Sequence, residues 1–232
     1  MTPHTIIWDF DGTLYPLCPL DSEQALLRMR RVQLQKGAYR FRGLWIEMLI
    51  YGDQHQWFRN RNSRKVYRML YDCALKGMPA FFLDCVAKDI AALISVDDRK
   101  ALHAMHDSGL RMLVISCGTQ ELCEKVLEKA GLRDYFEIIR ANPLKLESGS
   151  IVGGVPRLVS AEDKLSLAKE LLGRDPKGVA AVGDGYTDIP LLDWVQWPVM
   201  MDPDLSNRQK YASKPYRFIP SIGFLPGLLA QL

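Results

Sequence analysis

Hydrophobic residues along this chain follow two different patterns. Short continuous apolar runs, each followed by a glycine-containing turn, occur at residues 5–8, 110–115 and 179–182. Runs of this length that end in turns are typical of buried strands. Residues 17–100, between the first two runs, instead place apolar residues at helical spacing and carry no strand signal of weight.

The second half of the chain alternates between strand and helix patterns. Predicted helices at 120–130 and 161–172 separate the buried runs, and residues 143–159 resemble one or two hairpins. This alternation predicts an α/β fold with a Rossmann-like, mainly parallel sheet and helices on both faces. The helical stretch after the first strand then forms an inserted all-helical cap domain. We expect a discontinuous core of residues 1–16 and 101–232, and a cap of residues 17–100.

Local signals within the insert predict where its helices begin. Asp21 followed by Gln24 resembles a capping box. Ser63 is the predicted cap of a helix that ends before Gly77. The apolar residues of this helix, at helical spacing, are Val66, Leu70 and Cys73.

Composition indicates the class of protein, its compartment and its partners. The chain has 232 residues, of which 48% are hydrophobic, enough for a proper core. Five cysteines, without a CxxC pair, favour a reduced, cytoplasmic location, and neither a signal peptide nor a membrane span is evident. The net charge of +3 implies no nucleic-acid partner. Nothing indicates the oligomeric state.

The insert is more basic than the rest of the chain. Residues 28–68 hold 11 Lys and Arg against 2 Asp and Glu, interleaved with aromatic residues. These charges fit solvated helix faces over an aromatic core. They also fit a cap that attracts an anionic substrate. A nucleic-acid surface is a third interpretation, which no recognised binding motif supports.

Acidic and polar residues cluster where the predicted strands end. Asp9 and Asp11 follow the first strand two positions apart, so their side chains point the same way. Ser116 and Asp184 follow two other strands. Because the carboxyl ends of parallel strands meet at one edge, these residues should converge with Lys164, near a helix start. Carboxylates, a hydroxyl and an ammonium group suit Mg²⁺ and a phosphate.

In order and spacing, these residues resemble the four motifs of the haloacid dehalogenase-like hydrolase superfamily, in its phosphoserine phosphatase-like branch. The matching segments are Asp9-Phe10-Asp11-Gly12-Thr13, Val114-Ile115-Ser116-Cys117-Gly118, Lys164 and Gly183-Asp184-Gly185-Tyr186-Thr187-Asp188. The helical insert lies where that branch carries its cap.

The resemblance implies roles for the acidic residues. Asp9 would be the nucleophile and form an aspartyl-phosphate. Asp11 would protonate the leaving alcohol and then activate water. Mg²⁺ would be held by Asp9, by the backbone carbonyl of Asp11 and by Asp184, while Asp188 would fix the metal's water shell or orient Lys164.

The resemblance also implies a phosphate-binding set of Ser116, Cys117, Gly118 and Lys164. Lys164 would also take part in catalysis, although Lys145 and Lys169 are rivals for its place. Cys117 stands where the branch often has glycine, and it fits a small space-filling residue better than a redox switch.

The expected function is therefore Mg²⁺-dependent hydrolysis of a small phosphorylated metabolite. The second aspartate favours phosphoester cleavage over dehalogenation, since an alkoxide needs a proton to leave and a halide does not. Alternatives are a phosphomutase or phosphotransferase with the same intermediate, and a catalytically silent phosphate-ligand binder. Cys18 stands where phosphoserine phosphatases carry a substrate-binding Glu, and neither Asp21 nor Glu23 has the right spacing to replace it. We therefore predict weak or no turnover of phosphoserine.

Overall fold

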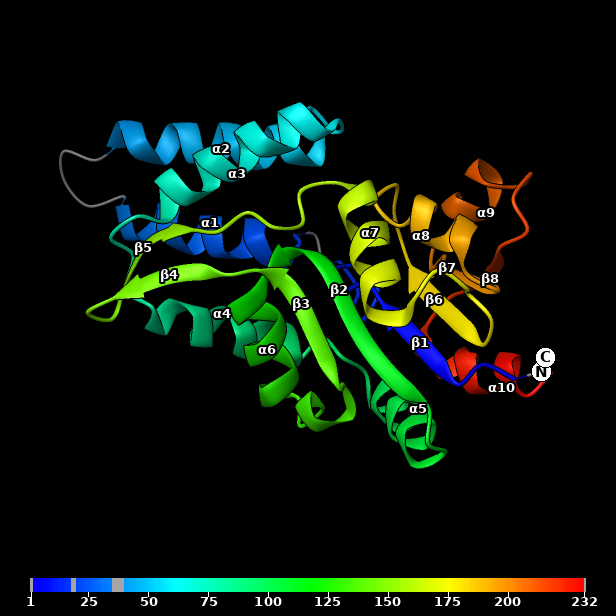
Figure 1. Cartoon of the computed structure of the whole chain (residues 1–232). Coiled ribbons are helices and arrows are strands. Elements are labelled where there is room, and N and C mark those ends of the chain that lie inside the picture. Colours follow the sequence, from blue (N-terminus) through cyan, green and yellow to red (C-terminus); the bar gives the residue numbers. More distant parts are fainter. Residues whose placement is uncertain (1, 18–19, 35–39, 232) are drawn as a thin grey trace.

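The computed structural model of the chain describes residues 2–17, 20–34 and 40–231 (Figure 1). Its centre is a six-stranded sheet in the order β3-β2-β1-β6-β7-β8, with every neighbouring pair parallel. The strands are β1 (Thr5–Trp8), β2 (Arg111–Thr119), β3 (Ile138–Asn142), β6 (Val179–Gly183), β7 (Trp197–Met201) and β8 (Arg217–Ile219). The predicted α/β class with a mainly parallel sheet is confirmed.

Helices cover both faces of this sheet, and β1 shows why. Its side chains alternate, so that Ile6 and Trp8 face one side and Ile7 the other. The first side packs against α5 (Val96–Asp107), α6 (Gln120–Lys129) and α10 (Leu225–Leu229). The second packs against α7 (Ala161–Leu172) and α8 (Ile189–Trp194). Short elements complete the core: η1 (Arg133–Tyr135), α9 (Ser206–Lys210) and η2 (Ile222–Phe224).

Between β1 and α5, the described residues form four helices. They are α1 (Ser22–Leu34), α2 (Arg40–Gln54), α3 (Arg61–Leu75) and α4 (Phe81–Ala91). A hairpin of β4 (Leu144–Glu147) and β5 (Ser150–Gly154), from the second half of the chain, joins them. The backbone N–H groups of Gly77 and Ala80 donate to the carbonyls of Ile151 and Gly149 at 2.7 and 2.8 Å. Backbone hydrogen bonds therefore connect this hairpin, which follows β3 in the sequence, to the inserted helical segment.

The expected boundary at residue 100 falls inside α5. This helix is continuous, is capped by Ser95, and packs mainly on η2 and α10 beneath the sheet. We therefore propose that the cap ends after α4, within residues 92–95. Among the described residues, no helix is both long and apolar enough to cross a membrane.

Two local expectations about α3 are wrong. Asn60, not Ser63, caps the helix: its side chain accepts the Ser63 N–H at 2.8 Å, and the Ser63 hydroxyl accepts the Asn60 N–H in return. The buried face is also different: of the three predicted apolar residues only Leu70 packs against the core, whereas Val66 is 46% exposed and Cys73 is exposed. The helix instead buries Tyr67, Arg68, Tyr71, Ala74 and Leu75.

Residues 116–119, expected to form a turn, instead continue β2. Thr119 still pairs with Asn142 of β3, across an irregular register that begins after Ile115. Ser116, Cys117 and Gly118 belong to β2, but the irregularity leaves them without regular pairing partners in β3.

Candidate functional site

The sheet topology gathers the predicted residues at one edge. From β1 the sheet continues through β2 on one side and β6 on the other, and ligands of open α/β sheets bind where the strand order divides in this way. Asp9 follows β1 directly, Ser116 lies near the carboxyl end of β2, and Asp184 follows β6. A cavity of about 490 Å³ opens here. It is lined by Asp9, Asp11, Ser116, Cys117, Gly118, Lys164 and Asp184, together with residues of α1–α3.

Lys164 lies at the centre of this edge and is only 1% exposed. Its Nζ is 2.5 Å from Asp9 Oδ1 and 2.6 Å from Asp188 Oδ1. Burial opposes the ammonium charge, but Asp188 and Asp9 outweigh it and hold the pKa of Lys164 well above its ordinary value. Its rival Lys169 instead lies over the ring of Trp194. The structure therefore brings Lys164, and not Lys169, to the carboxylates.

The acidic residues are suited to a hard cation. Asp9, Asp184 and Asp188 each have a carboxylate oxygen within 4.8 Å of the others. The oxygens of Asp188 are already engaged by Lys164 and by the N–H groups of Asp184 and Gly185, at 3.2 and 3.1 Å. Asp9 and Asp184 therefore retain oxygens that could bind a metal, while Asp188 holds Lys164 and the loop in place. This donor set of hard oxygens fits Mg²⁺.

The glycine after Asp11 makes this crowding feasible. Gly12 has φ +76°, and a Cβ at this position would come within 2.1 Å of Asp184 Oδ2. Only glycine combines that backbone conformation with so close an approach. The Asp-Gly turn thus lets β1 and β6 bring their acidic residues together.

Asp11 is oriented by two donors. Its Oδ1 accepts the Ser22 N–H at 2.7 Å and the hydroxyl of Tyr15. Burial, followed by the nearby charge of Asp11, raises the pKa of Tyr15 well above its usual value, so the phenol remains a donor. Asp11 Oδ2 lies next to Gly118: a Cβ atom on Gly118 would be only 2.9 Å from this oxygen. Sequence reasoning missed Tyr15, whose only signal is its place four residues after Asp11.

The irregular last residues of β2, Ser116 to Thr119, are compact, and we call them the β2 loop. Ser116 Oγ accepts the Gly118 N–H at 2.9 Å. The thiol of Cys117 lies 3.8 Å from the Ser160 carbonyl, and burial raises the pKa of Cys117 to about 11. A thiol with this pKa stays protonated at neutral pH, which favours the space-filling interpretation over a redox switch.

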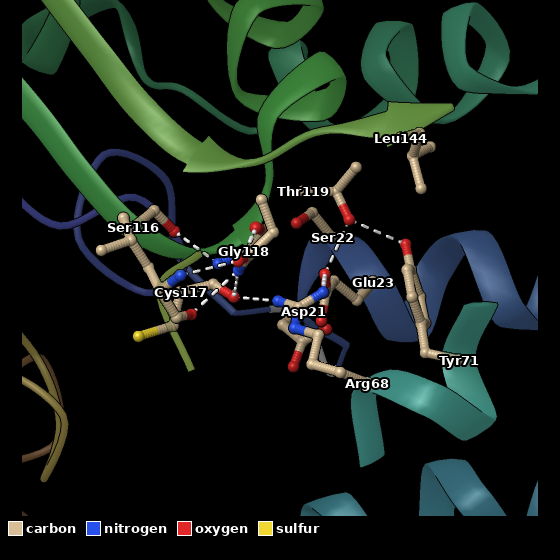
Figure 2. Close-up of polar contacts among 12 residues, drawn as sticks. Asp21, Ser22, Glu23, Arg68, Tyr71, Ser116, Cys117, Gly118, Thr119 and Leu144 are labelled. Carbon is tan, nitrogen blue, oxygen red and sulfur yellow. Dashed lines mark hydrogen bonds and ion pairs between the residues drawn. The ribbon is translucent and has the colours of Figure 1, made fainter. Parts of the chain in front are cut away.

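A buried polar network connects the inserted helices to this loop (Figure 2). Glu23 of α1 accepts the hydroxyl of Thr119 at 2.6 Å and pairs with Arg68 of α3. Arg68 also donates to the carbonyl of Cys117. The hydroxyl of Tyr71 lies 2.9 Å from Thr119 Oγ1. Sequence reasoning considered Glu23 only as a replacement for the acid expected at Cys18, which lies outside the described residues, and it missed Arg68.

The wall of the cavity formed by the insert is not basic. Asp21, Glu23 and Asp53 line it, and Arg64 is the only Lys or Arg of the described insert residues to do so. Arg64 is paired with Asp53 at 2.6 Å. Burial, followed by the charges of Asp11, Asp53 and Glu23, raises the pKa of Asp21 well above its ordinary value. The basic bias of the insert therefore lies mostly outside the cavity.

The crowded carboxylates should make the metal-free protein less stable as pH rises. Burial, then Asp188, raises the pKa of Asp9 from 3.8 to about 7, and burial, then Asp9, raises the pKa of Asp184. An acid whose pKa is higher in the folded state contributes stability fully below its unfolded pKa, and this stability is lost as pH rises through the folded value. We expect the free energy of unfolding in EDTA to fall by a few kcal/mol between pH 5 and pH 8, at about 1.4 kcal/mol per tenfold change in proton affinity.

Denaturant titrations at both pH values measure this effect. The carboxyls whose pKa is lowered by ion pairs, such as Asp84 and Glu137, lose their stabilising contribution only as pH falls below about 4, so they do not interfere. Asp9→Asn should reduce the dependence. A metal-free protein whose stability is constant from pH 5 to pH 8 would contradict the raised pKa values.

Comparisons with known proteins agree with this geometry. A family model described as haloacid dehalogenase-like hydrolase matches residues 6–193. The phosphoserine phosphatase of Albidiferax ferrireducens is 33% identical over 96 residues, which cover 37% of this chain and 38% of that protein. The phosphoserine phosphatase of Lactococcus lactis is 28% identical over 123 residues, covering 51% of this chain and 54% of that protein. The chain thus spans about half or less of the length of these relatives.

Solved structures resemble this chain over its whole length. One, described as a phospho-aspartyl intermediate analogue of phosphoserine phosphatase, has a TM-score of 0.68 at 18% identity and covers 100% of both chains. A cytosolic 5'-nucleotidase bound to cytidine has a TM-score of 0.69 at 16% identity, covering 98% of this chain and 84% of that one. At such low identity, these structures establish the fold alone.

Proposed function

This chain belongs to the haloacid dehalogenase-like hydrolases, and we propose that it is a Mg²⁺-dependent phosphatase that hydrolyses a small phosphomonoester through an aspartyl-phosphate. The observation that carries the proposal is the convergence of Asp9, Asp11, Lys164 and Asp184 on one cavity. Phosphoryl transfer depends mainly on positioning and on neutralising charge. This set supplies a nucleophile, an acid, the positive charge of Lys164 and carboxylates that would hold Mg²⁺.

In the first step, a carboxylate oxygen of Asp9 attacks phosphorus and the bond to the leaving oxygen breaks. Asp11 gives its proton to that oxygen, so the alcohol leaves neutral. The Ser116 hydroxyl, whose Oγ accepts the Gly118 N–H, and Lys164 hold the phosphoryl oxygens as their charge shifts. Mg²⁺, held by Asp9, the Asp11 carbonyl and Asp184, would supply the further positive charge that these acidic residues require.

In the second step, Asp11 removes a proton from water, which attacks phosphorus and releases phosphate from Asp9. Asp188 does not meet the substrate in this scheme. It holds Lys164 through Oδ1 and the Asp184 loop through Oδ2, so it positions both.

The cavity wall suggests the character of the leaving group. Where the alcohol would lie, the insert presents mostly polar residues, among them Asp21, Gln24, Asp53 and Arg64, with Leu17 and Phe58 as apolar exceptions. A hydrophilic alcohol that carries hydroxyl or amino groups suits this wall, whereas a lipid or aryl group does not. We therefore propose that the natural substrate is a small, polar phosphorylated metabolite.

Phosphate release from a panel of phosphorylated metabolites tests the function. With Mg²⁺ and no acceptor, we expect at least one polar phosphomonoester to be hydrolysed, and EDTA should stop the reaction. Phosphoserine should be a weak substrate, and rapid phosphoserine turnover would contradict that prediction. Transfer to an added alcohol without release of free phosphate would instead indicate a phosphotransferase or mutase. A ligand-induced rise in Tm without any turnover would indicate a binding protein.

A further inference from the structure

The peptide between Cys117 and Gly118 joins the helical insert to the candidate phosphate site. Its carbonyl accepts hydrogen bonds from Arg68 Nη2 and from Asn142 Nδ2, the latter at 2.8 Å. Its N–H, on Gly118, points to Ser116 Oγ at 2.9 Å, beside Asp11. Figure 2 shows Arg68 reaching this loop from α3. One face of the peptide thus meets an inserted helix, and the other meets the cavity.

The directions of the C=O and the N–H of this peptide group are coupled. In a trans peptide the C=O and N–H lie in one plane and point in opposite directions. A donor that fixes the Cys117 carbonyl therefore also fixes the direction of the Gly118 N–H. Because Arg68 is charged and is 4% exposed, its bond to the carbonyl is strong and weakly screened. A positive charge on the carbonyl side also polarises the N–H and makes it a better donor.

The network behind Arg68 holds it in place. Glu23 is 4% exposed, pairs with Arg68, and accepts the hydroxyl of Thr119 from the same loop. Burying an ion pair often brings no net stability compared with apolar residues of the same size, so stability alone gives little reason for this arrangement. Both charged residues instead contact the segment that would hold the phosphoryl group.

We propose that Arg68 is a positioning residue: from the helical insert, it fixes the Gly118 N–H, which donates to Ser116 Oγ and so orients the Ser116 hydroxyl as a donor to the transferring phosphoryl group. The inference rests on the proposed function, because it assigns that role to the β2 loop. The donor should matter most when phosphorus is five-coordinate and its equatorial oxygens carry more charge. Arg68 should therefore affect a mimic of that state more than it affects bound phosphate.

The test compares binding of orthovanadate, which becomes five-coordinate when it binds the nucleophile, with binding of inorganic phosphate, both by calorimetry with Mg²⁺. In Arg68→Met we expect vanadate affinity to fall roughly 10- to 100-fold, the range for loss of an oriented donor, and phosphate affinity to fall much less. The kcat for p-nitrophenyl phosphate should fall with vanadate affinity, while KM changes little. In Arg68→Ala, added guanidinium should restore part of the kcat.

Arg30→Met is the matched control. Arg30 is another buried arginine of the insert, and it donates to the carbonyls of Ala74 and Lys76 at 3.2 and 2.9 Å. Its loss should lower Tm but leave the ratio of vanadate to phosphate affinity unchanged. If Arg68→Met does not fold, Glu23→Gln replaces it and should lower the same ratio, by a smaller factor.

The outcomes separate the two proposals. Wild-type protein that binds both anions, with variants that keep its affinity ratio, overturns the positioning role and leaves the proposed function intact. Equal losses of both affinities in Arg68→Met would also overturn that role, since they indicate a merely structural contribution. Wild-type protein that binds neither anion contradicts the proposed function, and the positioning role with it.

Discussion

Asp9→Asn should reduce phosphate release from any phosphomonoester by at least ~10⁴-fold, as loss of the nucleophile does in other enzymes with covalent intermediates. The asparagine has nearly the shape of the aspartate and can still accept from Lys164, but its amide cannot form the aspartyl-phosphate. Steady-state release of p-nitrophenol, followed with excess enzyme to detect small residual rates, measures the loss.

A measurement of stability distinguishes loss of the nucleophile from unfolding of the variant. Since burial and Asp188 oppose the charge of Asp9, the asparagine variant should be no less stable than wild type at pH 8 without metal. Asp175→Asn is a suitable control, because Asp175 is exposed and its ion pair with Lys177 is loose at 3.8 Å. Its side chain also accepts the Lys177 N–H at 3.1 Å, which an asparagine oxygen can accept as well. An Asp9→Asn protein that retains a hundredth of wild-type turnover would refute the nucleophile assignment.

Asp11→Asn should slow the hydrolysis of alkyl phosphates by ~10²- to 10⁴-fold, the usual contribution of a general acid and base. The first step should suffer less with p-nitrophenyl phosphate, because p-nitrophenolate leaves without a proton. The second step still needs a base to activate water, so phosphorylated enzyme should accumulate. We therefore expect a rapid burst of p-nitrophenol, equal to the enzyme concentration, followed by a slow steady state.

Rapid-mixing absorbance measurements detect this burst. Asparagine can still accept the Ser22 N–H and the Tyr15 hydroxyl, so the loop should keep its conformation. Tyr15→Phe provides a comparison in which the acid remains but loses one orienting donor. Equal slowing of alkyl and p-nitrophenyl substrates in Asp11→Asn, without a burst, would argue against the acid–base role.

The sequence was sufficient to predict that the polar residues at the strand ends lie together. Asp9 and Asp11 follow a buried apolar run, and the spacing of two residues already places them on one side of the chain. Lys164 was harder to predict from the sequence, because a lysine early in an amphipathic helix is usually solvated. Its selection over Lys169 became clear only when the structure placed its Nζ between Asp9 and Asp188.

Arg68 could not be found from sequence pattern, and α3 shows why. The expected apolar stripe ran through Val66, whereas the buried stripe runs through Tyr67 and Tyr71. Tyrosine combines an apolar ring with a polar hydroxyl, so periodicity assigns it weakly to either face. The error also hid the neighbouring Arg68, whose partner Cys117 lies on another element, 49 positions along the chain.

The central position of β1 has a consequence for how the protein is made. Thr5–Trp8 pairs with residues 111–114 on one side and 179–182 on the other. When β1 leaves the ribosome, neither neighbour has been synthesised, and both of its edges remain open while the inserted helices emerge. Such late, long-range pairing exposes apolar strand surface to aggregation. Nascent chains that stall before residue 179 should therefore depend on chaperones, although their inserted helices are already complete.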